Sequence, residues 1–171
     1  MVCRFSLFSA IAFILLLLFS FKLQAEWQPV EVQSAGLAFS MPENRTCVKE
    51  RMQTVFNECE IHVGADEMGC AYFAVMARTC RPIDLPSLQE GFLQGFISGG
   101  KENYKISAKE TIFKKMRAMH FQIRREGRLL QGYVFLKGAW ACFFAAESPA
   151  DEYDAAAVHR FFDEVAQIKS N

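Results

Sequence analysis

The sequence predicts an α+β domain in which an antiparallel meander sheet is packed by two helices, after an N-terminal signal peptide. Apolar residues recur with period two in several segments after Trp27, which is typical of half-buried strands, and other segments are apolar on both faces. Two stretches, one mid-chain and one at the end, have helical spacing instead. Because strands follow one another in runs and do not alternate with helices, a parallel doubly wound sheet is disfavoured.

Residues 1–25 predict a signal peptide, which leaves residues 26–171 as a single α+β domain. Arg4 gives a short basic start, residues 5–21 are almost wholly apolar, and Ala25 suits signal-peptidase cleavage after it. We therefore expect an exported protein, periplasmic or extracellular. The alternative is a membrane anchor formed by an uncleaved 5–21 segment, since its length is at the lower edge of what spans a bilayer. Membrane contact is expected only if this N-terminal leader, residues 1–25, is retained.

The first strands are expected over residues 36–41, 59–63 and 70–79. In 59–63 apolar residues alternate with polar ones, which indicates a strand with one buried and one solvated face. His62 is therefore expected to be exposed. Residues 66–69 are expected to close the hairpin between the second and third of these strands.

The mid-chain helix is expected to begin at Asp84, whose side-chain oxygens suit the capping of free backbone amides. Apolar residues then recur at helical spacing until Gly99-Gly100 ends the run. Glycines in this stretch are spaced four apart, which permits close backbone approach. This spacing predicts a helix lying close on the sheet, or alternatively a partner- or membrane-facing surface built on Phe92 and Phe96.

The second run of strands is expected from residue 104 to residue 146, with Gly127 supplying the permissive backbone of one turn. Residues 129–136 and 139–146 are apolar on both faces, which predicts central strands in a sheet covered on both sides. Ser148-Pro149-Ala150-Asp151 combines a capping residue, a proline and an acid, and predicts the start of the closing helix.

This layout resembles the Mog1/PsbP-like fold, in particular its small exported bacterial members. The resemblance covers about residues 34–169 and depends on four features: Leu37-Ala38-Phe39-Ser40-Met41-Pro42, the mid-chain helix, the long meander, and the final Phe161-Phe162-Asp163-Glu164 helix. It implies an accessory or binding protein and carries over no functional residue.

Cysteines beyond the leader raise the question of disulfides, which an exported domain can hold. Cys59 and Cys70 flank the expected hairpin loop and are predicted to face each other across it. Cys47 with Cys80 is a second candidate pair, and Cys142, in a strongly apolar strand, is expected to be free and buried. The alternative is that all of these cysteines are unpaired thiols.

We expect no catalytic residue, cofactor or metal. Cys59 and His62 are close in sequence, but positions three apart on a strand point to opposite faces. A hydrolase would need a nucleophile and a base, such as Cys142 with His120 or His159. His120 is instead expected on a polar outer face, and His159 among solvated acids on the closing helix.

Charge distribution points to the class of partner. The chain carries 19 basic and 19 acidic side chains and has no basic run, so it lacks the clustered cations that nucleic-acid binding needs. Basic residues gather between 105 and 128, and Lys114, Lys115 and Arg117 are the candidate contacts to an acidic partner. The alternative is a solvated edge that protects the sheet from aggregation.

These observations predict a small exported envelope protein, a non-catalytic accessory or binding domain with a protein partner in the cell envelope and no nucleic acid. The alternatives are a membrane-anchored partner-binding protein and an enzyme of unrecognised type.

Overall fold

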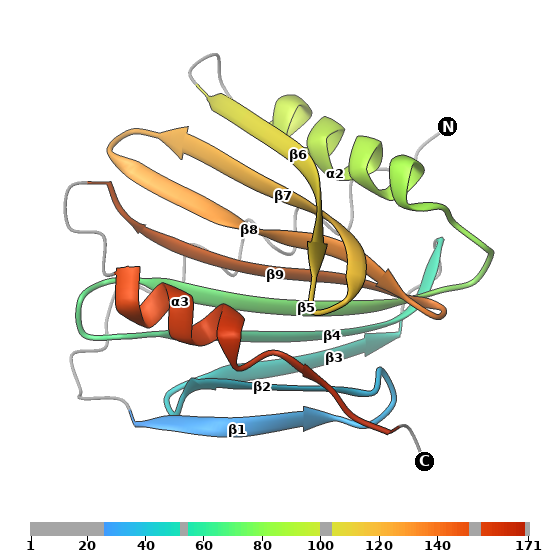
Figure 1. The fold of residues 1–171 in the computed structure, drawn as a ribbon, viewed down its shortest axis with the longest axis horizontal. Helices are drawn as coiled ribbons and strands as arrows, with labels where there is room; N and C mark the ends of the chain where they lie inside the picture. Colours follow the sequence, from blue (N-terminus) through green and yellow to red (C-terminus); the bar gives the residue numbers. More distant parts are fainter. Residues whose placement is uncertain (1–25, 52–54, 100–103, 151–154, 170–171) are drawn as a thin grey trace.

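A computed structural model describes residues 26–51, 55–99, 104–150 and 155–169, apart from the side chains of residues 96–99. The predicted signal peptide lies outside these residues. Within the described ranges, the strands form two antiparallel sheets, and two helices pack on the larger one (Figure 1). The predicted α+β class, with an antiparallel meander packed by two helices, is confirmed.

The larger sheet has the spatial order β3-β4-β5-β9-β8-β7-β6 in the described part of the chain. Its strands are β3 (Thr46–Arg51), β4 (Phe56–Ala65), β5 (Ala71–Thr79), β6 (Lys105–Phe113), β7 (Met116–Arg125), β8 (Arg128–Lys137) and β9 (Trp140–Pro149). All neighbours except β5 and β9 are consecutive in the chain. The strands that the sequence predicts to be central, β8 and β9, do lie in the interior of the sheet.

A smaller sheet and the two helices cover the two faces of the larger one. The smaller sheet has the order β1-β2-β10, formed by β1 (Trp27–Val32), β2 (Leu37–Pro42) and β10 (Ala166–Gln167). Helix α2 (Leu85–Gly99) packs on one face, and α3 (Ala155–Asp163) lies on the other face beside the smaller sheet (Figure 1). Strand alternation therefore fills two separate cores, one on each face of the larger sheet.

Aromatic rings dominate both cores. Phe92 of α2 packs on Phe121 and Phe143 of the sheet, with ring centroids 4.7 and 5.3 Å apart. On the other face, Phe39 and Phe144 meet edge to face at 5.1 Å. Burial of one such side chain contributes about 1.5–3 kcal/mol, so these rings supply much of the force that holds the layers together.

The local sequence signals for one helix cap and one turn are confirmed, and the signal for the start of the closing helix is not. The backbone amide of Ser87 donates to Asp84 Oδ1 at 2.7 Å, which is the predicted helix cap, and Gly127 has φ +74° in the β7–β8 turn. The predicted helix start at Ser148 is wrong, because β9 continues through Pro149. Ser148 is paired with Leu129 on β8, and residues 151–154 lie outside the described ranges.

No helix in the described ranges combines the length and apolar composition that crossing a bilayer requires.

Candidate functional site

The β6–β7 hairpin places two lysines in a strained turn. Lys114 and Lys115 have φ values of +50° and +68°. A side chain in this left-handed region costs about 1–2 kcal/mol, and Asn-Gly is the pair that ordinarily forms such a turn. Lys114 recovers part of this cost, because its Nζ donates to the backbone oxygen of Asp163 at 2.6 Å. Lys115 is exposed and has no hydrogen bond or ion pair to the described part of the chain.

An exposed apolar side chain lies beside these cations. Ile112 is 66% exposed and stands directly opposite Arg117 on the neighbouring strand. Arg117 is 3.5 Å from Glu110, but both side chains are exposed, so solvent screens this ion pair and leaves it weak. We call Ile112, Lys115 and Arg117 the tip surface.

A hollow of about 320 Å³ opens between α3 and the larger sheet, beside the tip surface. Aromatic side chains form much of its wall: Phe113 stacks on Tyr133 at 4.0 Å, and Phe162 meets Tyr133 edge to face at 5.2 Å. Lys114 and Asp163 also line it, which makes the hollow continuous with the hairpin. The hollow thus combines aromatic rings with charged and polar side chains, which can contact both apolar and polar groups of a partner.

His120 lies in this hollow, which corrects its predicted place on a polar outer face. It is half-buried because α3 covers that face of β7, and its ring is 5.1 Å from that of Tyr133. Burial, and then the charge of Lys109, lower the pKa of His120, so its imidazole is neutral at pH 7. His159, exposed on α3, lines the same hollow.

Cys142 does not join these histidines. It is buried, as predicted, and it does not line the hollow. Its Sγ lies 3.7 Å from the backbone oxygen of Trp140, and burial raises the pKa of its thiol. Since the thiolate is the nucleophile, this cysteine is a packing residue.

The two phenylalanines considered for a partner surface are not available to one in the described structure. Phe92 is on α2 and is buried against the larger sheet, so its partner-facing interpretation is wrong, and the alternative of packing on the sheet holds. The side chain of Phe96 lies outside the part of the chain that the structure describes. A Cβ added at Gly91 would meet nothing within 4 Å, so close approach to the sheet does not explain that glycine.

Both predicted disulfide pairs are wrong. Cys47, Cys59, Cys70, Cys80 and Cys142 all lie in described ranges, and no disulfide joins any two of them. Cys59 is paired with Ala77, far along the β4–β5 pair from the hairpin loop. Cys70 is at the end of that loop, so Cys59 and Cys70 cannot meet. Cys47 stands opposite His62 in the middle of β4, whereas Cys80 follows the far end of β5. Strand register therefore separates each pair.

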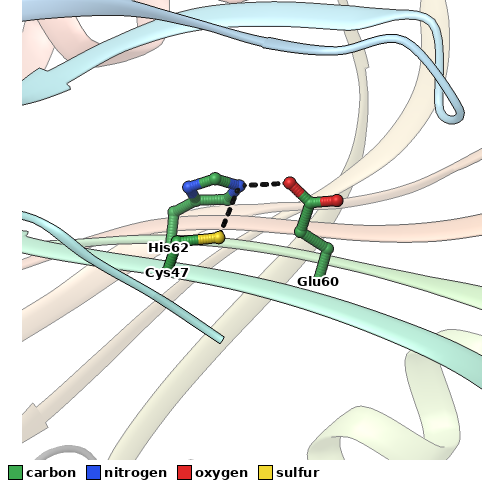
Figure 2. A group of neighbouring side chains, drawn as sticks. All are labelled: Cys47, Glu60 and His62. Atoms are coloured by element: carbon green, nitrogen blue, oxygen red, sulfur yellow. Dashed lines mark hydrogen bonds and ion pairs between the residues drawn. The ribbon is translucent and has the colours of Figure 1, made fainter. Parts of the chain in front are cut away.

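The β3–β4 ladder instead brings Cys47, Glu60 and His62 together (Figure 2). Cys47 is directly opposite His62, and Glu60 is two residues earlier on β4, so all three side chains share one face. Glu60 Oε1 is 2.8 Å from His62 Nε2, and Cys47 Sγ is 3.8 Å from the same nitrogen. We call these three residues the β3–β4 cluster.

His62 is only 4% exposed, which corrects its predicted exposure. The smaller sheet covers this face of β4, and the Phe39 ring stands edge-on to the imidazole at 5.5 Å. Burial is the main cause that lowers the pKa of His62, and the hydrogen bond that His62 donates to Glu60 acts in the opposite direction. The neutral imidazole donates its Nε2–H to the carboxylate. Its Nδ1 is buried and has no hydrogen-bond partner among the described residues.

The β3–β4 cluster does not have the geometry of a nucleophile triad. In a triad, the acid bonds one ring nitrogen and the nucleophile bonds the other. Here Glu60 and Cys47 approach the same nitrogen of His62. Burial, and then the charge of Glu60, raise the pKa of the Cys47 thiol, so the thiolate is disfavoured.

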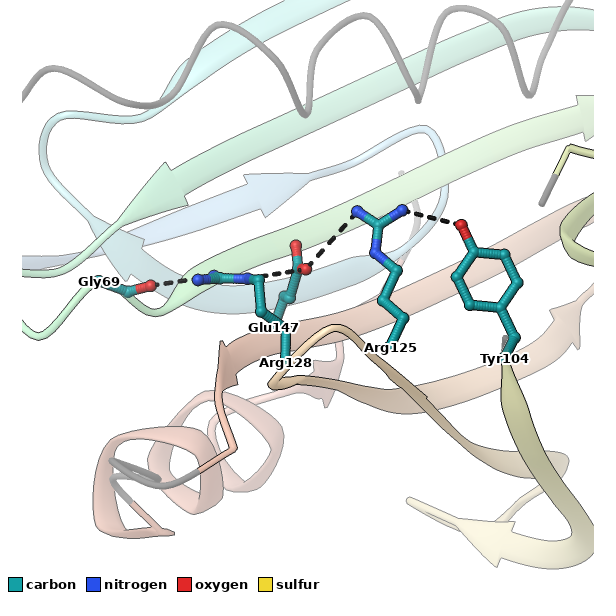
Figure 3. Close-up of polar contacts among 5 residues, drawn as sticks. All are labelled: Gly69, Tyr104, Arg125, Arg128 and Glu147. Carbon is teal, nitrogen blue, oxygen red and sulfur yellow. Dashed lines mark hydrogen bonds and ion pairs between the residues drawn. The ribbon is translucent and has the colours of Figure 1, made fainter. Parts of the chain in front are cut away.

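A second charged group joins the strand ends opposite the hairpin tip (Figure 3). Glu147 is 6% exposed and accepts a 2.9 Å hydrogen bond from Arg128 Nε. Arg128 also donates to the backbone oxygen of Gly69, and Arg125 donates to the hydroxyl of Tyr104 at 3.1 Å. Two of the basic residues between 105 and 128 are thus engaged within the domain, where they connect β7, β8, β9 and the β4–β5 loop.

Comparison with known proteins identifies the architecture. No protein-family model and no curated protein sequence matches the chain. The chain is similar in structure to cyanobacterial PsbP (CyanoP) from Synechocystis sp. PCC 6803, solved in solution, with a TM-score of 0.57. The match covers 84% of this chain and 93% of that chain.

The chain has a PsbP/Mog1-like fold. The resemblance drawn from the sequence is confirmed at this level. Sequence identity to CyanoP is 10%, so the similarity to that protein is one of fold alone. The tip surface, the hollow and the β3–β4 cluster are therefore argued from this chain's own residues.

Proposed function

We propose that the chain is a small exported accessory domain of the cell envelope that binds a protein partner and catalyses no reaction. The observation that carries this proposal is the junction of the tip surface with the hollow. Exposed Ile112 and unpaired Lys115 adjoin an aromatic wall that is already formed in the unbound domain.

The chemistry of this surface indicates the kind of partner. Lys115 and Arg117 favour an acidic surface, because complementary charge speeds encounter and fixes register. The wall of the hollow, with Tyr133 and Phe162, fits one apolar or aromatic side chain of that partner. Ile112 adds apolar contact at the rim. The partner is therefore expected to present an apolar anchor residue among acidic residues.

Two arguments support a role without catalysis. The histidines that face the hollow have no cysteine or serine among the residues that line it with them. The fold is also the one for which the sequence resemblance implies accessory or binding proteins. Export is supported by the composition of residues 1–25, and retention of residues 5–21 as an anchor is the alternative form of the same proposal.

The test is a charge reversal with a matched control. The full chain, tagged at its C-terminus, is recovered from the envelope of its own host, and the co-purifying protein is identified and quantified. Lys115→Glu with Arg117→Glu is expected to reduce its recovery several-fold. The control is Lys105→Glu with Arg124→Glu, two exposed and directly opposed cations at the other end of the same β6–β7 pair.

Recovery that falls equally in both double variants would show that general charge, and not the tip surface, attracts the partner. Unchanged recovery in both would overturn the proposed docking place. Intact mass of the recovered wild-type chain separates the two forms of the proposal, since a cleaved leader removes residues 1–25 and an anchor retains them.

A further inference from the structure

We propose that Cys47, Glu60 and His62 form a binding site for a divalent cation of the zinc type on the β3–β4 ladder. This inference is independent of the partner-binding proposal, because the β3–β4 cluster does not share a residue with the tip surface or the hollow. It rests on the spacing of the three ligand atoms and on their donor chemistry.

The spacing of the ligand atoms fits one ion. The thiol, imidazole and carboxylate atoms all lie within 4.8 Å of one another. Zinc bonds of about 2.3 Å to sulfur and about 2.0–2.1 Å to nitrogen, at a tetrahedral angle, place those two ligands about 3.5 Å apart. The observed distance from Cys47 Sγ to His62 Nε2 is 3.8 Å. These two ligands therefore need to move by only a few tenths of an ångström, and rotation of the Glu60 and Cys47 side chains, whose ligand atoms lie within 4.8 Å, brings the third ligand into place.

The donor set selects the metal. A thiolate, an imidazole and a carboxylate are ligands that zinc accepts together, whereas calcium and magnesium take oxygen atoms almost alone. Three protein ligands leave a fourth tetrahedral position. Cys47 is exposed, so that position opens toward solvent and gives the ion an entry path. His62 and Glu60, which are buried, hold the other side of the site in place.

The Glu60 carboxylate supplies an anionic ligand atom from a buried position. Lys49 Nζ contacts its Oε2 at 3.0 Å, while Oε1 lies 2.8 Å from His62 Nε2. On binding, the ion replaces the proton on His62 Nε2, which moves to Nδ1, and the thiol proton of Cys47 goes to solvent. The ion, one thiolate and one carboxylate then sum to zero charge, and the neighbouring Lys49 adds one positive charge. No oxidation or reduction is involved.

Cobalt(II) is the probe, because thiolate ligation gives it a sulfur-to-cobalt charge-transfer absorption. The full chain is purified reduced and without a histidine tag, and Co²⁺ is titrated in. We expect one Co²⁺ per chain, the charge-transfer absorption, and displacement by Zn²⁺. Cys47→Ser is expected to abolish that absorption and to weaken binding at least tenfold. Cys80→Ser, which removes an exposed thiol outside the cluster, is expected to leave both unchanged.

A second measurement uses the unaltered chain and so does not depend on how a variant folds. Bound Zn²⁺ is expected to slow alkylation of Cys47 strongly and to leave alkylation of Cys80 unchanged. The proposal would be overturned by cobalt that binds without the charge-transfer absorption, or by the same absorption in Cys47→Ser. Equal protection of Cys47 and Cys80 from alkylation would also overturn it. Absence of binding at millimolar Co²⁺ would overturn it as well.

Discussion

The side-chain nitrogen of Lys114 donates a 2.6 Å hydrogen bond to the backbone oxygen of Asp163, the last residue of α3. Gln167 returns a 2.9 Å hydrogen bond from its side chain to the backbone oxygen of Lys114. The β6–β7 hairpin is thereby tied to the C-terminal segment, and the two walls of the hollow are held in place before any partner arrives. Preorganisation of this kind lowers the entropic cost of association.

Replacement of Lys115 by glycine is expected to stabilise the domain and to weaken partner binding. Lys115 has φ +68°, and glycine adopts this conformation without the steric cost, so the free energy of unfolding should rise by about 1 kcal/mol. Urea unfolding measures this gain, and recovery of the partner measures the loss. Glu126→Gly is the control, since Glu126 also has positive φ but lies at the other end of β7. It should gain stability and keep partner recovery.

Thiol reactivity is expected to separate the cysteines into two groups. Cys47 and Cys80 are exposed and should react with iodoacetamide in metal-free native protein faster than the buried cysteines, although the raised pKa of Cys47 slows its reaction relative to an ordinary exposed thiol. Cys59 and Cys142 should react slowly, because both are buried and burial raises the pKa of Cys59 to about 12. After unfolding without reductant, intact mass should show alkylation at all five cysteines beyond the leader. Fewer than five would reveal a disulfide that the described structure lacks.

Glu147→Gln is expected to cost about 1–3 kcal/mol of stability, because it leaves Arg128 without the charged acceptor that it bonds in a partly buried site. Urea unfolding measures the change. Glu110→Gln is the matched control. The pair of Glu110 with Arg117 is exposed, so its removal should change stability by less than about 0.5 kcal/mol. Equal effects of the two substitutions would contradict a structural role for Glu147.

Acid is expected to weaken the fold through His120. The ordinary histidine pKa is about 6.5, and burial and Lys109 lower the pKa of His120 in the folded domain. As pH falls below about 6.5, the unfolded chain takes up the proton first, so this residue's contribution to stability is full above that pH and declines below it. Urea unfolding of His120→Gln between pH 7 and pH 5 should show a shallower decline than wild type. If the free energy of unfolding falls equally with pH in wild type and His120→Gln, His120 is not the cause of the acid sensitivity.

The sequence predicts the elements whose signals are local. The two-sided apolar strands β8 and β9 are found where expected, because only interior strands with both faces covered have that pattern. The Asp84 cap and the Gly127 turn also follow from short-range chemistry. Local signals therefore establish the fold class and the PsbP-like layout.

The errors arise where distant segments cover a strand face. His62 and His120 are polar positions in alternating strands, and alternation alone assigns them to solvent. The smaller sheet covers His62, and α3 covers His120. Both contacts bring together segments that are far apart in the sequence. Ser148 fails for a similar reason, since pairing with Leu129 overrides a local helix-start signal. The β3–β4 cluster has no local sequence signal, because it depends on the register that places Cys47 opposite His62.

The most direct test of partner binding at the tip surface is site-specific photo-crosslinking in the host cell. A benzophenone-bearing residue is placed at Ile112, which is 66% exposed, or at Met68, which is 55% exposed in the β4–β5 loop at the other end of the sheet. The account predicts one discrete adduct from position 112 and none from position 68. The same adducts from both positions, or no adduct from position 112, would contradict it.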